Sequence, residues 1–189
     1  ESKGLKTFDN IGDFLASRLF DIVLVATPNQ FHCPYVCAAL EAGYHAMSEK
    51  PVAMTSAEIE RMIATAKKAG RVFTVHHNRR WDRDCLIVKE ALEAGYCGNL
   101  ITVENRIHAK NGGNGHMFGW RELADHGGGM LGDWGVHMLD QTLYLFDGPI
   151  QSVFASVKTI RSYDVDDYAK IIIRFADGLT AQVESTTFS

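Results

Sequence analysis

The order of apolar runs and helical periods in the first part of the chain predicts a parallel sheet. Residues 21–26 read Asp-Ile-Val-Leu-Val-Ala, an almost unbroken apolar run typical of a strand buried on both faces of such a sheet. Further strands are predicted at 45–47 and 71–75, and helices at 13–18, 31–42 and 55–69. Strands that alternate with helices through short connections predict right-handed crossovers, with helices on the faces of the sheet.

The period of the pattern changes after residue 80. A helix predicted over 84–94 is followed by segments in which apolar and polar residues alternate, at 100–109, 150–160, 168–176 and 179–188. The last two flank Asp177-Gly178, a strong hairpin signal. Alternation is typical of an antiparallel sheet with one covered face. The pattern therefore predicts an α/β protein, with a parallel-sheet domain over 1–80 and an α+β domain with a mostly antiparallel open sheet over 81–189.

Polar residues follow each of the three predicted parallel strands. They are Thr27-Pro28-Asn29 with His32, then Glu49-Lys50-Pro51, then residues 76–80. Each group taken alone is also explained by ordinary turn chemistry or by a solvated ion pair. Parallel sheets bind ligands at the carboxyl ends of their strands, so the joint position of the three groups predicts a ligand site there.

The segment from residue 127 to residue 146 begins with three glycines and continues as a largely apolar helix. At 100° per residue, Asp133, His137, Asp140 and Tyr144 fall within about 60° of one another. A helix that is apolar around most of its circumference is buried, so this polar stripe needs partners or a cleft. A structural ion pair between Asp133 and His137 is one explanation. The glycine run, which permits close backbone contact, and the lysine loop of the first domain favour a functional site instead.

Composition and charge exclude several classes of partner. The 189 residues are 46% hydrophobic and carry a net charge of −4 without a long basic cluster, so no nucleic-acid partner is expected. The uncharged stretch 22–40 is interrupted by prolines, so no membrane-spanning helix is expected. Four irregularly spaced cysteines predict reduced thiols and a cytoplasmic protein. The His and Cys spacings match no metal-binding motif, so no metal site is expected.

Four motifs occur in a characteristic order: Ala26-Thr-Pro-Asn29 with His32, Glu49-Lys-Pro51, Asn78-Arg-Arg80, and a Gly-Gly-Gly-x-Leu-x-Asp-x-Gly-x-His-x-x-Asp run that begins at Gly127. In order and approximate spacing they resemble the glucose-fructose oxidoreductase, inositol dehydrogenase and MocA (Gfo/Idh/MocA) family over nearly the whole chain. The resemblance implies a Rossmann dinucleotide-binding domain, of which 1–80 is the C-terminal part, and a substrate-binding domain that is incomplete at its end. It also implies NAD(P)-dependent dehydrogenases or reductases that act on CH–OH groups of sugars, polyols and related carbonyls.

The resemblance also assigns roles to residues. On the cofactor side, for NAD or NADP, it places Thr27, Pro28, Asn29, His32, Glu49, Lys50 and Arg80. On the substrate side it places Lys50, Trp120, Asp133 and His137. The catalytic residues are matched by Lys50, Asp133 and His137. The open sheet of the second domain is implied as the surface of a homo-oligomer.

The chemistry of alcohol oxidation suits these residue types. A hydride leaves carbon and a proton leaves oxygen, so the site needs a nicotinamide face and a proton acceptor. Histidine has a reference pKa of about 6.5, which suits His137 to the acceptor role. Lys50 would stabilise the developing alkoxide, and Asp133 would hold a neighbouring hydroxyl or orient the imidazole. A lysine base assisted by histidine is the alternative. We expect the three residues to converge on one cleft.

The sequence departs from the family in one respect. It does not contain the opening strand, its GxGxxG turn or the acidic residue of the second strand, so we interpret the chain as a fragment. Pyrophosphate binding is therefore assigned to no residue, and the choice between NAD and NADP stays open. A competing function is a non-catalytic sensor of sugars or dinucleotides on the same fold. The joint presence of Lys50, Asp133 and His137 favours catalysis.

Overall fold

The chain divides into two compact units in the computed structural model, Glu1–His76 and His77–Ser189, with residues 4–108 and 119–188 described. The hydrophobic pattern predicted a division after Arg80. Residues 77–80 belong to the second unit because their hydrogen bonds are made within it. Arg80 pairs with Asp140, and the carbonyl of Arg79 accepts from Gln141.

The first unit is built on a parallel sheet, as predicted. Its strands are β1 (Ile22–Val25), β2 (His45–Ser48) and β3 (Phe73–Val75), in the sheet order β1-β2-β3. Its helices are α1 (Ile11–Ala16), α2 (His32–Glu41) and α3 (Ser56–Ala69), with a 3-10 turn η1 (Asn29–Phe31) before α2. Helix α3 has the expected ends, because Thr55 Oγ1 accepts the N–H of Glu58 at 3.2 Å and Gly70 follows with a φ of 62°.

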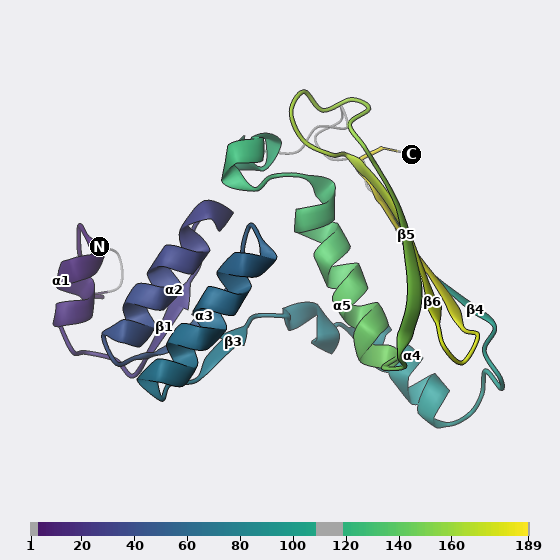
Figure 1. The fold of residues 1–189 in the computed structure, drawn as a ribbon, viewed down its shortest axis with the longest axis horizontal. Helices are drawn as coiled ribbons and strands as arrows, with labels where there is room; N and C mark the ends of the chain where they lie inside the picture. The colour runs from purple at the N-terminus through teal and green to yellow at the C-terminus, as the bar shows by residue number, and fades with distance from the viewer. Residues whose placement is uncertain (1–3, 109–118, 189) are drawn as a thin grey trace. The chain divides into compact units, whose positions relative to one another are not determined.

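Helices α2 and α3 cover the same face of this sheet (Figure 1). The core that they form with β1 includes Val23, Val25, Val36, Leu40 and Met62. The prediction that β1 is buried on both faces is wrong, because Ile22 and Leu24 alternate with the core residues and are 52% and 55% exposed. A sequential strand order with two right-handed crossovers puts both helices on one side, which leaves these two side chains without a covering layer among the described residues.

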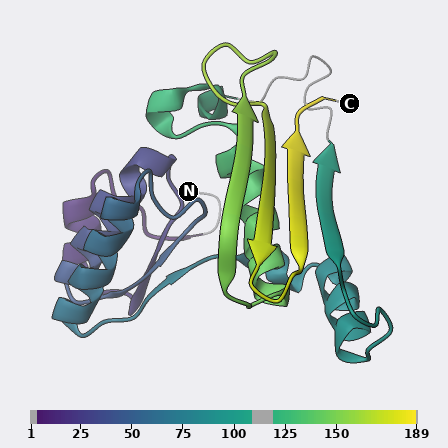
Figure 2. The ribbon, with the colours of Figure 1, turned by 45° about the vertical axis from the view of Figure 1, so that its right-hand side comes forward.

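The second unit contains a four-stranded sheet in the order β4-β7-β6-β5, and Figure 2 shows its strands side by side with α5 behind them. Strand β6 pairs antiparallel with β5 and β7, and β4 pairs parallel with β7, so the sheet is mostly antiparallel as predicted. The strands are β4 (Thr102–His108), β5 (Ile150–Lys158), β6 (Tyr168–Phe175) and β7 (Thr180–Thr186). The helices are α4 (Arg83–Glu93) and α5 (Val136–Leu145), with short helical turns η2 (Asn78–Trp81), η3 (Gly119–Glu122), η4 (Ala124–His126) and η5 (Leu131–Gly135).

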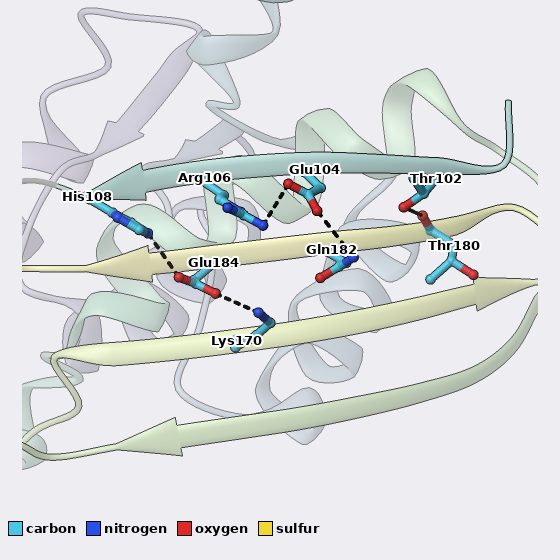
Figure 3. Close-up of polar contacts among 8 residues, drawn as sticks. All are labelled: Thr102, Glu104, Arg106, His108, Lys170, Thr180, Gln182 and Glu184. Atoms are coloured by element: carbon cyan, nitrogen blue, oxygen red, sulfur yellow. Dashed lines mark hydrogen bonds and ion pairs between the residues drawn. The ribbon is translucent and has the colours of Figure 1, made fainter. Parts of the chain in front are cut away.

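The two faces of this sheet differ in character. The inner face and α5 form a core that includes Met138, Ile171, Ile173, Phe175, Ala181 and Val183. The outer face of β4, β6 and β7 carries polar pairs, shown in Figure 3. There Glu184 accepts from Lys170 at 2.9 Å and lies 3.0 Å from His108. Charged groups rather than an apolar layer therefore cover most of the open face.

Helix α5 is less buried than its composition predicted. Met138 and His137 are 0% and 6% exposed, but Leu143 is 41% exposed. One side of the helix packs on the sheet, and Leu143 lies on a side that no described element covers. No helix in the described ranges is long and apolar enough to cross a membrane.

Candidate active site

The three polar groups that follow the parallel strands lie along one sheet edge. The ladder continues past the strand ends, because the N–H of Glu49 donates to Val25 O at 2.9 Å and the N–H of His76 donates to Ser48 O at 2.9 Å. The residues just after β1, β2 and β3 are therefore neighbours across the edge, which is the usual ligand-binding edge of such a sheet.

At this edge Glu49 and His76 form a hydrogen-bonded pair. Their Oε1 and Nδ1 atoms are 2.7 Å apart, and both side chains are partly exposed. Burial raises the pKa of Glu49, but the hydrogen bond and charge of His76, together with the N–H and charge of Lys50, outweigh it, so the pKa lies below its ordinary value. A carboxylate here accepts from the imidazole. The family resemblance assigned Glu49 to the cofactor side, and His76 was predicted only as a member of the polar group 76–80 that follows β3.

His32 connects two of the predicted cofactor loops. Its side chain is fully buried, with Nδ1 2.8 Å from Pro51 O and Nε2 2.9 Å from Thr27 O. Both partners are carbonyls, which only accept hydrogen bonds, so a neutral ring with a single N–H satisfies one of them at a time. His32 therefore lies between the two loops, inside the unit, and donates to one of their carbonyls at a time.

The loop after β1 also contains polar atoms suited to a ligand. Asn29 is 3% exposed, and Pro28 precedes the turn η1. Thr27 Oγ1 and Gln30 Oε1 are buried and have no hydrogen-bond partner among the described residues. Because buried polar groups are normally paired, these atoms fit a ligand that brings hydroxyl or amide groups to the edge. A nicotinamide dinucleotide has both.

In the second unit, the three glycines bring distant segments into contact. A Cβ at Gly128 would lie 2.2 Å from the carbonyl oxygen of Arg121, and a Cβ at Gly129 would lie 2.2 Å from Oδ1 of Asp166. Gly129 also has a φ of 112°, which L side chains rarely adopt. The structure thus gives the glycine run the close-approach role that the sequence suggested.

The helix that follows begins with the π-helical turn η5, which carries Asp133. Single π turns are rare and are frequent at functional sites. Arg121 Nε donates to Asp133 Oδ1 at 3.4 Å, and its guanidinium lies 4.6 Å from the ring centre of Trp120. Arg121 therefore joins Trp120 and Asp133, two residues that were predicted separately on the substrate side. The sequence assigned no role to Arg121.

His137 lies one turn further along, in the first turn of α5. It is 6% exposed and meets the edge of the Trp134 ring at a centroid distance of 6.3 Å. The guanidinium of Arg79 lies 4.2 Å from the centre of the same ring. Asp133 and His137 thus share a surrounding of tryptophan rings and arginine side chains, which suits polar and ring-shaped ligands.

The other end of the predicted stripe serves a different purpose. Arg80 Nε and Nη2 donate to the two carboxylate oxygens of Asp140 at 2.7 and 2.6 Å, and His77 Nε2 lies 3.5 Å from the same carboxylate. Tyr144 accepts from Lys89 Nζ at 3.0 Å. These contacts tie η2 and α4 to α5. The predicted role of Arg80 in cofactor binding stays a prediction.

Lys50 belongs to the first unit, and Asp133 and His137 to the second. Their convergence stays a prediction. Among the described residues, no group of three His, Cys, Asp or Glu side chains is placed to hold a metal ion.

Comparison with known proteins identifies the family. Residues 85–189 match the GFO/IDH/MocA C-terminal domain, and residues 1–77 match the oxidoreductase family with an NAD-binding Rossmann fold. The chain therefore belongs to the Gfo/Idh/MocA oxidoreductase family, as the four motifs indicated.

Individual relatives agree with this assignment. An NAD-binding protein from Listeria innocua of known structure is 44% identical, with a TM-score of 0.92, covering 98% of this chain and 55% of that one. The scyllo-inositol 2-dehydrogenase (NADP(+)) IolW of Bacillus subtilis is 35% identical over 75% of this chain and 38% of its own length. The D-glucoside 3-dehydrogenase of Escherichia coli is 32% identical over 89% and 45%. The chain spans about half the length of the curated relatives that it matches.

Proposed function

We propose that the protein is an NAD(P)-dependent oxidoreductase that transfers a hydride between the cofactor and a secondary alcohol or carbonyl of a sugar or polyol. One observation carries the proposal within this family. Asp133 and His137, the acid and the imidazole that the chemistry needs, lie on successive turns at the start of one helix. Close backbone contacts at Gly128 and Gly129 fix that start.

The cofactor would be held by the loops after β1, β2 and β3. This assignment is supported by the buried hydroxyl of Thr27, the position of His32 between two of these loops and the ionised Glu49 beside His76. When bound, a nicotinamide dinucleotide supplies the group that accepts or donates the hydride.

The residues of this chain would handle the proton and the hydroxyl groups. His137 would accept the proton of the reacting hydroxyl, and Asp133 would accept a hydrogen bond from a neighbouring hydroxyl. Lys50 would donate to the oxygen on which charge develops. The Arg121 contact keeps a positive charge beside Asp133.

The substrate class rests on the named relatives. One acts on an inositol and another on a glucoside, as their names state. Both substrates are rings with several adjacent secondary alcohols. A carboxylate that holds one hydroxyl while an imidazole deprotonates its neighbour would suit such rings.

The deciding experiment uses the full-length protein with NAD and NADP separately. Calorimetry measures dinucleotide binding, and the absorbance of the reduced nicotinamide measures turnover on a panel of sugars, inositols and glycosides. We expect binding and turnover with at least one pair. Absence of binding to both dinucleotides at millimolar concentration would refute the oxidoreductase function. Dinucleotide or sugar binding without turnover across the panel would identify the sensor alternative instead.

We also propose that the protein self-associates through the sheet of the second unit. On the edge strand β5, Phe154 is 62% exposed on the outer face, across from Ile172, and Val153 and Val157 are 58% and 44% exposed on the opposite face. Exposed apolar side chains in this number favour burial against a second copy. Light scattering of the full-length protein should give an oligomer, and Phe154→Glu should weaken it. A strictly monomeric wild type would refute the proposal.

A further inference from the structure

The loop between β5 and β6, residues 159–167, is folded around one of its own aspartates. Asp167 is 1% exposed, and its carboxylate accepts the backbone N–H groups of residues 160–162 at 2.8, 2.6 and 2.8 Å. Its own N–H donates to Lys158 O at 3.1 Å. A carboxylate with three N–H donors gives the loop a defined shape. Two other aspartates of the loop contact segments outside it.

Asp166 contacts the start of the helix that carries Asp133 and His137. Its carboxylate Oδ2 accepts the N–H of Leu131 at 2.7 Å, and its backbone carbonyl accepts the N–H of Met130 at 2.8 Å. The first N–H groups of a helix have no partner within the helix, so Asp166 satisfies two of them at once. The N–H of Asp133 then donates to Gly129 O at 3.0 Å.

The space for this contact exists only because residue 129 is glycine. A Cβ there would lie 2.2 Å from Oδ1 of Asp166. The requirement for glycine and the position of the carboxylate therefore belong to one arrangement. Burial raises the pKa of Asp166, and the N–H group of Leu131 opposes that rise. A carboxylate that is costly to bury is thus held against the helix by direct hydrogen bonds.

Asp164 makes a similar contact with a different segment. Its Oδ2 accepts the N–H of Ala124, in η4, at 2.7 Å. Asp164 and Asp166 are thus two carboxylates of one loop that each cap a helical turn, and only Asp166 caps the turn that carries Asp133. This difference supplies a matched control.

We propose that Asp166 is a positioning residue that fixes the start of η5 and thereby the placement of Asp133 and His137. The proposal rests on the proposed function for its effect on turnover, but not for its effect on the geometry of the helix start. Removing the carboxylate frees the N–H of Leu131 and leaves only the bond from Met130 to the backbone carbonyl of residue 166, so the start of the turn is no longer held at two points. A displacement of reacting groups of about 1 Å is enough to lower turnover about a hundredfold.

The test compares Asp166→Ala, Asp166→Asn and Asp164→Ala in the full-length protein. We expect Asp166→Ala to lower kcat about ten- to a hundredfold, with the Kd for the dinucleotide unchanged. An asparagine oxygen still accepts the N–H of Leu131, so Asp166→Asn should recover most of kcat. Asp164→Ala should leave kcat within about twofold of wild type, since its carboxylate contacts η4 alone.

A second readout does not need turnover. The ring signals of His137 in NMR spectra, assigned by their loss in His137→Gln, report the environment of the imidazole directly. We expect them to shift in Asp166→Ala, to shift less in Asp166→Asn and to be unchanged in Asp164→Ala. Folded Asp166 variants with wild-type kcat and wild-type His137 signals would refute the proposal. If Asp166→Ala does not fold, Asp166→Leu, which keeps the side-chain volume but has no acceptor for the N–H of Leu131, decides by the same two measurements. Failure of the wild type to turn over any substrate would refute the proposed function, and the NMR comparison would still decide the role of Asp166.

Discussion

Two aspartates on the same stripe of the same helix have different surroundings. Asp140 is held by two short hydrogen bonds from Arg80, at 2.7 and 2.6 Å, and its side chain is 11% exposed. Asp133 has a longer contact of 3.4 Å with Arg121, and its side chain is 20% exposed. The C-terminal half of the stripe therefore braces the second unit, and the N-terminal half remains the better candidate for chemistry.

A helical wheel cannot separate these two roles. It shows which residues share a face, but Arg80, which bonds to Asp140, lies in η2, and Arg121, which bonds to Asp133, lies in η3, so both contacts come from outside the helix. The geometry of the contact distinguishes them. A bidentate arginine pair such as that of Asp140 is typical of a fixed structural link, whereas the Arg121 contact of Asp133 is longer, at 3.4 Å.

The largest effect is expected on turnover, at the N-terminal end of α5. His137→Ala should lower turnover roughly 10²-fold or more with dinucleotide affinity nearly unchanged, because a general acid or base contributes about that much. Turnover normalised to folded protein, beside a melting curve, measures this. If His137 instead has only a structural role, the variant melts at a lower temperature and keeps its activity per folded molecule.

The second-largest effect is expected on stability, where Gly128 packs against the backbone of Arg121. Gly128→Ala should lower the free energy of unfolding by about 2 kcal/mol, because its Cβ would lie 2.2 Å from the backbone carbonyl oxygen of Arg121, which cannot move aside easily. Gly148→Ala is the control, since the nearest atom to its Cβ is 3.5 Å away, an ordinary contact. Denaturant unfolding of both variants gives the comparison, and an equal loss in the two would contradict the steric explanation.

Substitution of Asp140, further along α5, should change stability and leave turnover unchanged. Asp140→Ala should cost about 1–3 kcal/mol, since it leaves the guanidinium of Arg80 without its main partner. Asp147→Ala, an exposed carboxylate beyond the end of α5, should cost less than about 0.5 kcal/mol. Urea titrations measure both. A weaker dinucleotide affinity in Asp140→Ala would show that Arg80 also acts in cofactor binding, as the family resemblance implied.

Local patterns in the sequence predicted most of the architecture. The alternation of strands and helices, the start of the helix at Thr55 and the hairpin at Asp177 depend on neighbouring residues, so periodicity and turn chemistry were sufficient. The exposure of Ile22 and Leu24 was not predictable in this way, because an apolar run does not show how many layers cover a strand.

The supporting residues of the candidate site were missed for a related reason. Arg121 and Asp166 act on Asp133 and on the turn that carries it from segments that no motif links to them. The glycine run showed that something must approach closely, but it did not show which residue approaches. The contact of His76 with Glu49 was easier to predict, because both residues directly follow strands and so lie at the same sheet edge.

The smallest effect is expected on the outer face of the sheet, where Glu184 lies between Lys170 and His108. The hydrogen bond from Lys170 lowers the pKa of Glu184 despite partial burial. A carboxyl whose pKa is lower in the folded state stabilises the fold above its unfolded pKa of about 4.3, and this stability is lost as the pH falls through the folded value. Glu184→Gln should therefore cost less than about 1 kcal/mol near pH 7, because both partners of Glu184 are partly exposed and an amide oxygen still accepts from Lys170. The difference from wild type should shrink below about pH 4, as the wild-type carboxyl becomes protonated too. Urea titrations at both pH values measure it, and a difference that grows on acidification would show that Glu184 stabilises the sheet in its neutral form.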